Sequence, residues 1–146
     1  EVVSSAGSTV GIAMFGLDAR YSYRKFTARG QYIFSTLSDA SSYNRFSGRD
    51  LVKRMTGFYI EGAYNVLPIS YRQRLFAFVR YEDFDTHAAV PDNVLKNPAF
   101  HRQEVTTGLS YHLAPGVVFK LDYQSKSTAL EGDSNGQYNA GVGVWF

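Results

Sequence analysis

Charged side chains recur at every second position in several stretches of this chain, between aromatic and aliphatic residues. Glu61 follows Ile60, and Lys120 and Asp122 stand on either side of Leu121. Successive side chains of an extended strand point to opposite faces, so these charges would share a face that the apolar residues leave free. Opposite charges in nearly equal number could line a hydrated pore, or could fill a barrel interior with salt bridges. The candidate pore-lining residues are Asp18, Arg20, Arg29, Glu61, Arg80, Glu82, Arg102, Glu104, Lys120, Asp122 and Lys126.

A second group of cations lies in the polar stretch 38–54, where the residues at 47–55 could form a helical turn. The group consists of Arg45, Arg49, Lys53 and Arg54. If this stretch is a loop that folds into a pore, it would form a cationic constriction that favours anions. The alternative is a solvated outer loop.

Two further sets of polar residues could suggest metal binding or catalysis. Asp83, Asp85 and His87 alternate on one strand face, but no fourth metal ligand is identifiable, so a polar strand rim is the simpler interpretation. His101 and His112 have no evident orienting carboxylate beside them, and no nucleophile motif surrounds a serine. We therefore predict no catalytic residue, no metal site and no cofactor, and a hydrolase is a minor alternative.

The elements that must position these side chains are strands. Alternation with a period of two recurs at 13–24, 26–37, 56–67, 74–85, 101–113, 117–127 and 137–146. Aromatic and aliphatic residues occupy one face of each stretch, although Phe76 and Phe78 fall on the polar face. Stretches of about 10 to 12 residues exceed the usual globular strand and suit a tilted strand that crosses a lipid bilayer.

Composition supports the same fold class. The 146 residues include 11 Tyr, 11 Phe and 13 Gly, which is typical of antiparallel β structure. The chain has the length of one domain, and it lacks the run of about 18 apolar residues that a membrane-spanning helix requires. A formal net charge of +2 is too small to indicate nucleic-acid binding. We predict an all-β chain, a single β-barrel domain or barrel segment over residues 1–146.

The connections between the predicted strands alternate in length. Short turns are expected at 24–25, near Pro68 and at 114–116, and longer loops at 38–54, 86–100 and 128–136. Membrane barrels keep short turns on one side and long loops on the other. The pattern predicts an antiparallel transmembrane β-barrel. The alternation of connection lengths argues against a soluble ligand-binding barrel, whose apolar face would point inward. The alternation of side chains within the strands would, by itself, permit such a barrel.

The chain ends inside a predicted strand, on an aromatic carboxyl terminus. Water-soluble domains usually let their last residues fray, whereas 137–146 carries its apolar stripe to the final residue. This stripe therefore needs an apolar partner, and the pattern favours lipid.

Four stretches, 57–68, 78–82, 116–124 and 137–146, carry a resemblance to a known class of protein. Through them the chain resembles the carboxyl-terminal part of a Gram-negative outer-membrane porin-like barrel, of the broad group that contains the phosphate-selective porins. The resemblance implies insertion by the barrel-assembly machinery, which would read the terminal strand through Tyr138, Val142, Val144 and Phe146. It transfers no solute-binding residue.

The strand count raises a question of closure. Bacterial single-chain barrels contain an even number of strands, from 8 upward, whereas seven are expected here. Residues 1–12 would form either an extra strand of an 8-stranded barrel or an outer loop that leads into the last part of a larger barrel. We favour the larger barrel, because the strand at 13–24 should descend from the long-loop side.

These expectations define a hypothesis for function. The chain is expected to form an outer-membrane channel for passive diffusion of small hydrophilic solutes, with weak anion selectivity. The alternative is a non-conducting structural or adhesive barrel. Expected partners are outer-membrane lipid, lipopolysaccharide, the barrel-assembly machinery and further copies of the chain, but not nucleic acid. The expected location is the bacterial outer membrane.

Overall fold

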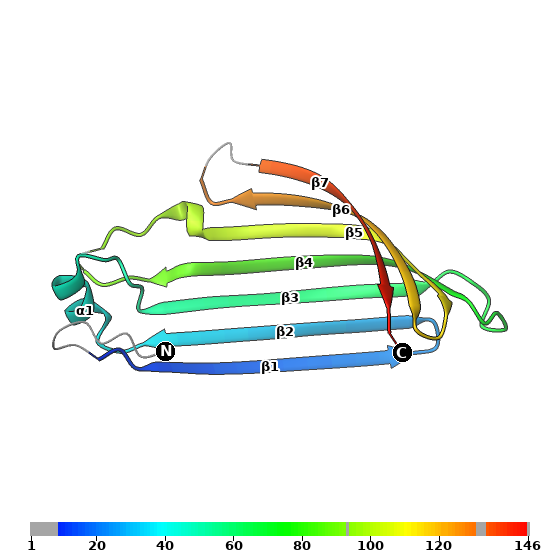
Figure 1. The fold of residues 1–146 in the computed structure, drawn as a ribbon, viewed down its shortest axis with the longest axis horizontal. Coiled ribbons are helices and arrows are strands. Elements are labelled where there is room, and N and C mark those ends of the chain that lie inside the picture. Colours follow the sequence, from blue (N-terminus) through cyan, green and yellow to red (C-terminus); the bar gives the residue numbers. More distant parts are fainter. Residues whose placement is uncertain (1–8, 93, 131–133, 146) are drawn as a thin grey trace.

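Seven antiparallel strands form one sheet, in which every strand pairs with its neighbours in the chain (Figure 1). The structure is a computed structural model, and it describes residues 9–92, 94–130 and 134–145. The strands are β1 (Ile12–Tyr23), β2 (Phe26–Leu37), β3 (Arg54–Asn65), β4 (Arg74–Ala89), β5 (His101–Ala114), β6 (Val117–Thr128) and β7 (Ser134–Val144). A helix, α1 (Ala40–Ser47), follows β2, and a single 3-10 turn, η1 (Pro98–Phe100), precedes β5. The prediction of an all-β chain with seven long antiparallel strands is confirmed.

The largest boundary differences are in β4 and β7. β4 extends past the predicted end to Ala89, and β7 begins at Ser134 and ends at Val144. Phe146, part of the predicted insertion signal, lies outside the described residues. So do residues 1–8 of the predicted outer loop or extra strand, and of the positions from 9 to 12 only Ile12 belongs to a strand.

The sheet is strongly curved into a trough, but it is open. Within the described ranges, β1 and β7 each pair with a single neighbour, and they do not pair with each other. These seven strands therefore do not close into a barrel, which from the sequence was expected to need at least one further strand. β5 approaches β6 closely at Gly108, where a Cβ atom would collide with the Leu121 carbonyl oxygen and with Asp122. Only glycine permits this close approach of the two strands.

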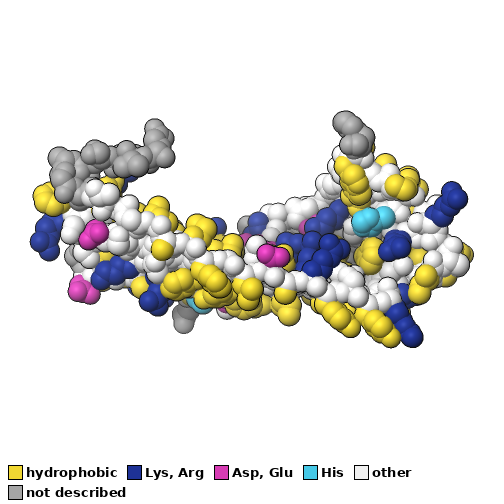
Figure 2. Space-filling model, turned by 90° about the horizontal axis from the view of Figure 1, so that it is seen from below, with side chains coloured by type: hydrophobic (Ala, Val, Ile, Leu, Met, Phe, Trp, Pro, Cys, Tyr) yellow, Lys and Arg dark blue, Asp and Glu magenta, His cyan; other side chains and the backbone are white. Residues whose placement is uncertain are grey.

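The two faces of the sheet differ in chemistry. Figure 2 shows hydrophobic side chains along the convex underside and charged side chains in the hollow above it. Ile60 on the convex face is 59% exposed, whereas its neighbour Glu61 on the concave face is 8% exposed. The alternation of the sequence therefore places the apolar residues outside and the charges inside the curve.

Connections at one end of the sheet, called here the turn end, are 24–25, 66–73 and 115–116. Those at the opposite end, the loop end, are 38–53, 90–100 and 129–133. Each end holds the connections predicted for it. The connections at the loop end are not all longer than those at the turn end, contrary to the prediction. Because β7 starts earlier than expected, the connection 129–133 is shorter than the connection 66–73.

Helix α1 lies at the loop end (Figure 1). The predicted helical turn over 47–55 is wrong, since the helix occupies the preceding residues and Gly48 ends it in a left-handed conformation (φ 66°). Asn44 explains the return of the chain toward β3. Its Nδ2 donates to the Leu51 carbonyl at 2.8 Å, and its Oδ1 accepts from the Leu51 amide at 2.7 Å. Leu37, Ala40 and Val52 are buried at this end.

Candidate functional site

The concave face holds all eleven candidate pore-lining residues. Strand alternation and the pairing register place them on this face from β1 to β6, so the prediction that they share a face is confirmed. The register also makes neighbours of residues that are distant in the chain. Arg29 pairs with Glu61, and Glu61 pairs with Arg80.

Glu61 is the centre of a charge network across three strands. Arg29 Nε donates to Glu61 Oε1 at 2.9 Å, and Arg80 Nε donates to Glu61 Oε2 at 2.9 Å. The Arg80 guanidinium also lies over the Tyr59 ring, 5.0 Å from its centroid. Both oxygens of this buried carboxylate are thus occupied by arginines, which is the strong, charge-assisted form of hydrogen bond. The network ties β2, β3 and β4 together and leaves the three residues with one net positive charge.

Amide side chains extend the polar face toward β7, which sequence reasoning missed. Gln137 Nε2 donates to Gln124 Oε1 at 3.1 Å, and Asn139 Nδ2 donates to Asp122 Oδ1 at 2.8 Å. Their positions follow the same alternation as the charges on β6 and the apolar stripe of β7. This parity is the sequence signal that extends the polar face from charged residues to uncharged amides.

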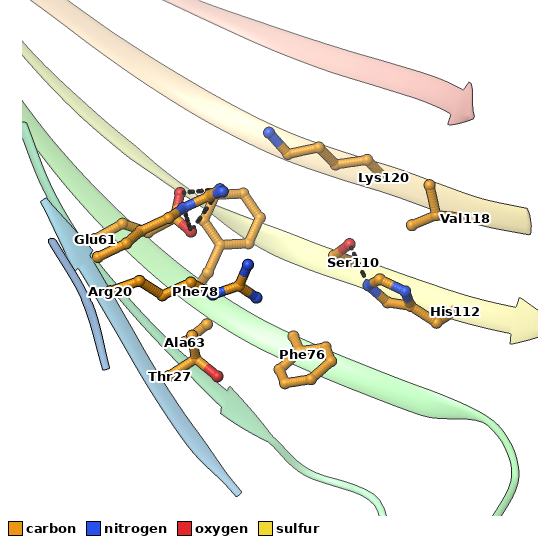
Figure 3. Close-up of a pocket in the computed structure, with 11 residues that line it drawn as sticks. Arg20, Thr27, Glu61, Ala63, Phe76, Phe78, Ser110, His112, Val118 and Lys120 are labelled. Atoms are coloured by element: carbon orange, nitrogen blue, oxygen red, sulfur yellow. Dashed lines mark hydrogen bonds and ion pairs between the residues drawn. The ribbon is translucent and has the colours of Figure 1, made fainter. Parts of the chain in front are cut away.

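A pocket of about 310 Å³ opens in the trough beside Glu61. Arg20, Arg29 and Lys120 contribute cations to its wall, and Phe76 and Phe78 contribute aromatic rings. Figure 3 shows the side chains of this pocket rising from neighbouring strands into one hollow. Lys120 Nζ lies 4.8 Å from the centroid of the Phe78 ring. The pocket therefore combines a cationic wall with an apolar one.

Ser110 and His112 are the only pair in the pocket that suggests acyl-transfer chemistry. Ser110 Oγ lies 3.4 Å from His112 Nε2, which is long for a hydrogen bond between these groups. The His112 ring packs against the edge of Phe76, with 5.4 Å between centroids, and no carboxylate of the described residues bonds to it. The geometry lacks the group that would orient the imidazole in a triad.

The four loop cations do not form one cluster. Arg45 lies on α1, and Arg45 and Arg49 are exposed, while Lys53 precedes β3. Arg54 belongs to β3, and its guanidinium lies 5.4 Å from the centroid of the Phe34 ring, on the convex face. The prediction that Arg54 belongs to the loop constriction is therefore wrong, because β3 begins earlier than expected and turns this side chain outward.

Asp83 is the centre of a polar cluster at the loop end of the convex face. Its Oδ1 lies 3.0 Å from His101 Nε2, and its Oδ2 accepts from Gln103 Nε2 at 3.0 Å. His101 thus has a carboxylate neighbour, contrary to the sequence-based expectation, because the β4–β5 register brings Asp83 close to it. No three His, Cys, Asp or Glu residues of the described ranges lie close enough to hold a metal ion.

Asp85, beyond the apolar part of β4, anchors the loop 90–100. Lys96 Nζ lies 2.8 Å from Asp85 Oδ2, and the His87 amide donates to Asp85 Oδ1 at 2.8 Å. Burial raises the pKa of Asp85, but the bonds from Lys96 and from the His87 amide outweigh it and leave this pKa below its ordinary value. The anchor therefore contributes stability above a pH of about 4, the ordinary pKa of an aspartate, and loses it as pH falls through the lowered pKa.

Replacing Asp85 with Asn will loosen this loop at neutral pH. We expect amide hydrogen exchange in 90–100 to rise about two- to fivefold at pH 7, since Lys96 is 51% exposed and such a pair contributes about 1 kcal/mol or less. After correction for intrinsic exchange rates, the wild-type loop should lose protection as pH falls below about 4, and the variant should not. Asp92→Asn, an exposed carboxylate of the same loop, is the matched control. Equal exchange in the two variants would contradict the anchor.

The fold and the pocket define the class as an all-β protein with a curved sheet, apolar outside and charged inside. No protein-family model matches the chain, and no solved structure matches it. It is similar to an uncharacterized protein of Aquifex aeolicus (strain VF5), with 40% identity over 90 residues. These residues make up 61% of this chain and 20% of the Aquifex protein, so the match spans a fifth of that relative. Among the described residues no helix is long and apolar enough to cross a membrane.

Proposed function

We propose that this chain forms part of the wall of an outer-membrane β-barrel that serves as a diffusion channel for small hydrophilic solutes. The observation that carries the proposal is the direction of curvature. The charged face lies inside the curve and the apolar face outside, which is the arrangement of a membrane barrel with an aqueous interior. A soluble ligand-binding barrel would require the opposite curvature.

The extent of the convex apolar surface supports a lipid environment. Leu17, Ile60, Leu121 and Val142 are each more than half exposed, on four different strands. Soluble proteins rarely expose continuous apolar patches larger than a few hundred Å². Charged strand residues of this face, within the described ranges, are confined to the loop end, where Arg54, Asp83 and Asp85 lie. The surface between that rim and the turn end is free of charge, as contact with hydrocarbon requires.

Barrel closure requires strands beyond these seven. Among the described residues, the outer edges of β1 and β7 have no strand partner, and such open edges are not stable against lipid. We infer that further strands of a longer polypeptide pair with both edges. The Aquifex relative is long enough for this, since the matched residues are 20% of it. In that barrel, the apolar positions Tyr138, Val142 and Val144 of β7 would serve the barrel-assembly machinery as an insertion signal.

The charges of the trough support conduction with a weak preference for anions. The eleven candidate pore-lining residues comprise six cations and five anions, and Arg20, opposite Arg29, forms no ion pair with a carboxylate of the described residues. A positive surplus at the wall raises the local concentration of anions. The loop cations Arg45 and Arg49 are available at the loop end to contact lipopolysaccharide phosphates.

Planar-bilayer recording tests the proposal. The protein expressed from its complete reading frame should give steady open levels, with a reversal potential in a KCl gradient displaced toward chloride. Replacing Arg20 and Lys120 together with Gln should move this potential toward potassium, because two cations leave the wall. Replacing Arg45 and Arg49 with Gln is the matched control and should leave the potential unchanged.

The outcomes separate the alternatives. Absence of any open level would favour the non-conducting structural or adhesive barrel, whose interior is filled by salt bridges. A shift in the reversal potential caused by the loop pair alone would place the selectivity in a loop constriction instead of the trough.

A further inference from the structure

The pocket beside Glu61 has more cations than its carboxylate can satisfy. Glu61 binds Arg29 and Arg80 with both oxygens. Arg20 stands directly opposite Arg29 in the β1–β2 register and forms no ion pair with any residue of the described ranges. Like charges at directly paired positions of a sheet repel each other. A bound anion between Arg20 and Arg29 would remove that repulsion.

Lys120, the other cation of the pocket, has only a long contact with a carboxylate. Lys120 Nζ lies 3.5 Å from Asp122 Oδ2, while Asp122 Oδ1 already accepts from Asn139. The ammonium group also lies over the face of the Phe78 ring. Lys120 and Arg20 come from β6 and β1, the outermost strands of the pocket, so an anion in the hollow would be approached by cations from both sides.

The pocket has an apolar wall on the face that carries most of the strand charges. Phe78 is buried, and the Phe76 ring packs against His112, so both rings are held in place. Ala63 on β3 and Val118 on β6 also line the pocket. An inorganic anion would gain nothing from these side chains, whereas an aromatic ring would pack against this wall, chiefly against Phe76, and gain apolar burial and ring contacts. A volume of about 310 Å³ lies at the lower end of the range for small-molecule sites.

We propose that this pocket binds a small aromatic carboxylate, with the carboxylate against Arg20 and Arg29 and the ring against Phe76 and Phe78. The inference rests on the proposed function in one respect. If the chain forms a channel, small aromatic carboxylates are a solute class that this channel would admit selectively. The binding itself depends only on the pocket.

Isothermal titration calorimetry of the detergent-solubilised protein, expressed from its complete reading frame, tests the proposal. The probes are benzoate, benzamide as a neutral ring of the same shape, acetate, and inorganic phosphate. Benzoate should bind at least about tenfold more tightly than each of the other three, because only benzoate uses both walls. Arg20→Gln should weaken benzoate binding about tenfold or more, and it should not unfold the sheet, since Arg20 is exposed and forms no ion pair with the described residues.

Two further variants sharpen the test. Phe76→Leu should weaken benzoate binding and leave acetate binding unchanged, which separates the apolar wall from the cationic one. Arg102→Gln, a concave cation outside this pocket, is the matched control and should leave benzoate binding unchanged. Phosphate binding as tight as benzoate, an equal effect of Arg102→Gln and Arg20→Gln, or no benzoate binding would each overturn the inference.

Bilayer recording distinguishes this failure from failure of the proposed function. Open levels without benzoate binding would leave the channel proposal standing and reject the aromatic-carboxylate site. Benzoate binding in a protein that never conducts would support the site and reject the channel.

Discussion

Replacing Ile60 with Arg will destabilise the protein in lipid vesicles by about 2 to 4 kcal/mol, the cost of an arginine at the middle of the lipid face of a barrel. Ile60 lies near the middle of β3 on the convex face, between Phe58 and Gly62, and no charged residue lies beside it on that face. The guanidinium would have to enter hydrocarbon or draw water and headgroups toward it. Urea-dependent folding into phospholipid vesicles measures the difference in free energy of unfolding.

Gln31→Arg is the matched control for Ile60→Arg. Gln31 lies on β2, pairs with Tyr59, and belongs to the concave face between Asp18 and Tyr59 in the register. An arginine there would remain in the hydrated trough near a carboxylate, so we expect a change of less than about 1 kcal/mol. Similar, small effects of both substitutions would show that the convex face is not in contact with lipid, and the barrel proposal would then fail.

Replacing Glu61 with Gln will lower stability by about 2 kcal/mol. Removing one partner of a fully buried ion pair costs about 3 to 5 kcal/mol, because a charge is left without compensation. The cost should be smaller here, since the Arg29 side chain is 44% exposed and can recover water. Arg80 cannot do so as readily, because its side chain is more buried and lies over Tyr59.

Glu82→Gln is the control for this substitution. Glu82 lies on the same face, but its contact with Arg80 is 3.8 Å, and Arg80 keeps its bonds to Glu61 when Glu82 is neutral. We expect a loss below about 1 kcal/mol. A double-mutant cycle of Glu61→Gln with Arg29→Gln should give a coupling energy of about 1 to 3 kcal/mol. Equal losses for Glu61→Gln and Glu82→Gln would show that the three-strand network does not act as a unit.

Sequence reasoning worked where the governing rule is local. The faces of β3 and β6 could be predicted because side chains of a strand alternate, whatever lies on the neighbouring strands. Glu61 and Lys120 were placed correctly on one face for this reason, and so were the exceptions Phe76 and Phe78. The residues at which strands begin and end could be predicted less exactly than the faces. Arg54 was assigned to a loop because nothing near it in the chain marks where pairing with β2 begins.

Contacts between strands could not be obtained in the same way. The neighbours of Glu61 are 32 and 19 residues away in the chain, and a shift of register by two residues would preserve both faces while giving it other partners. The side-chain contact of His101 with Asp83 could not be predicted for this reason, and neither could the contact of Lys120 with the Phe78 ring. The helix at Ala40–Ser47 is tied to the rest of its loop by Asn44, whose bonds to Leu51 exist only after the loop has folded back.

The all-β class, the seven long strands and the division into a polar and an apolar face can be read from the chain alone, because they follow from a two-residue repeat within each strand. The register that gives Glu61 two arginines, the curvature that puts the charges inside, and the edges that β1 and β7 leave open among the described residues appear only in the folded sheet. Register, curvature and closure depend on the fit between strands, and a single strand carries no information about how closely its neighbours will approach.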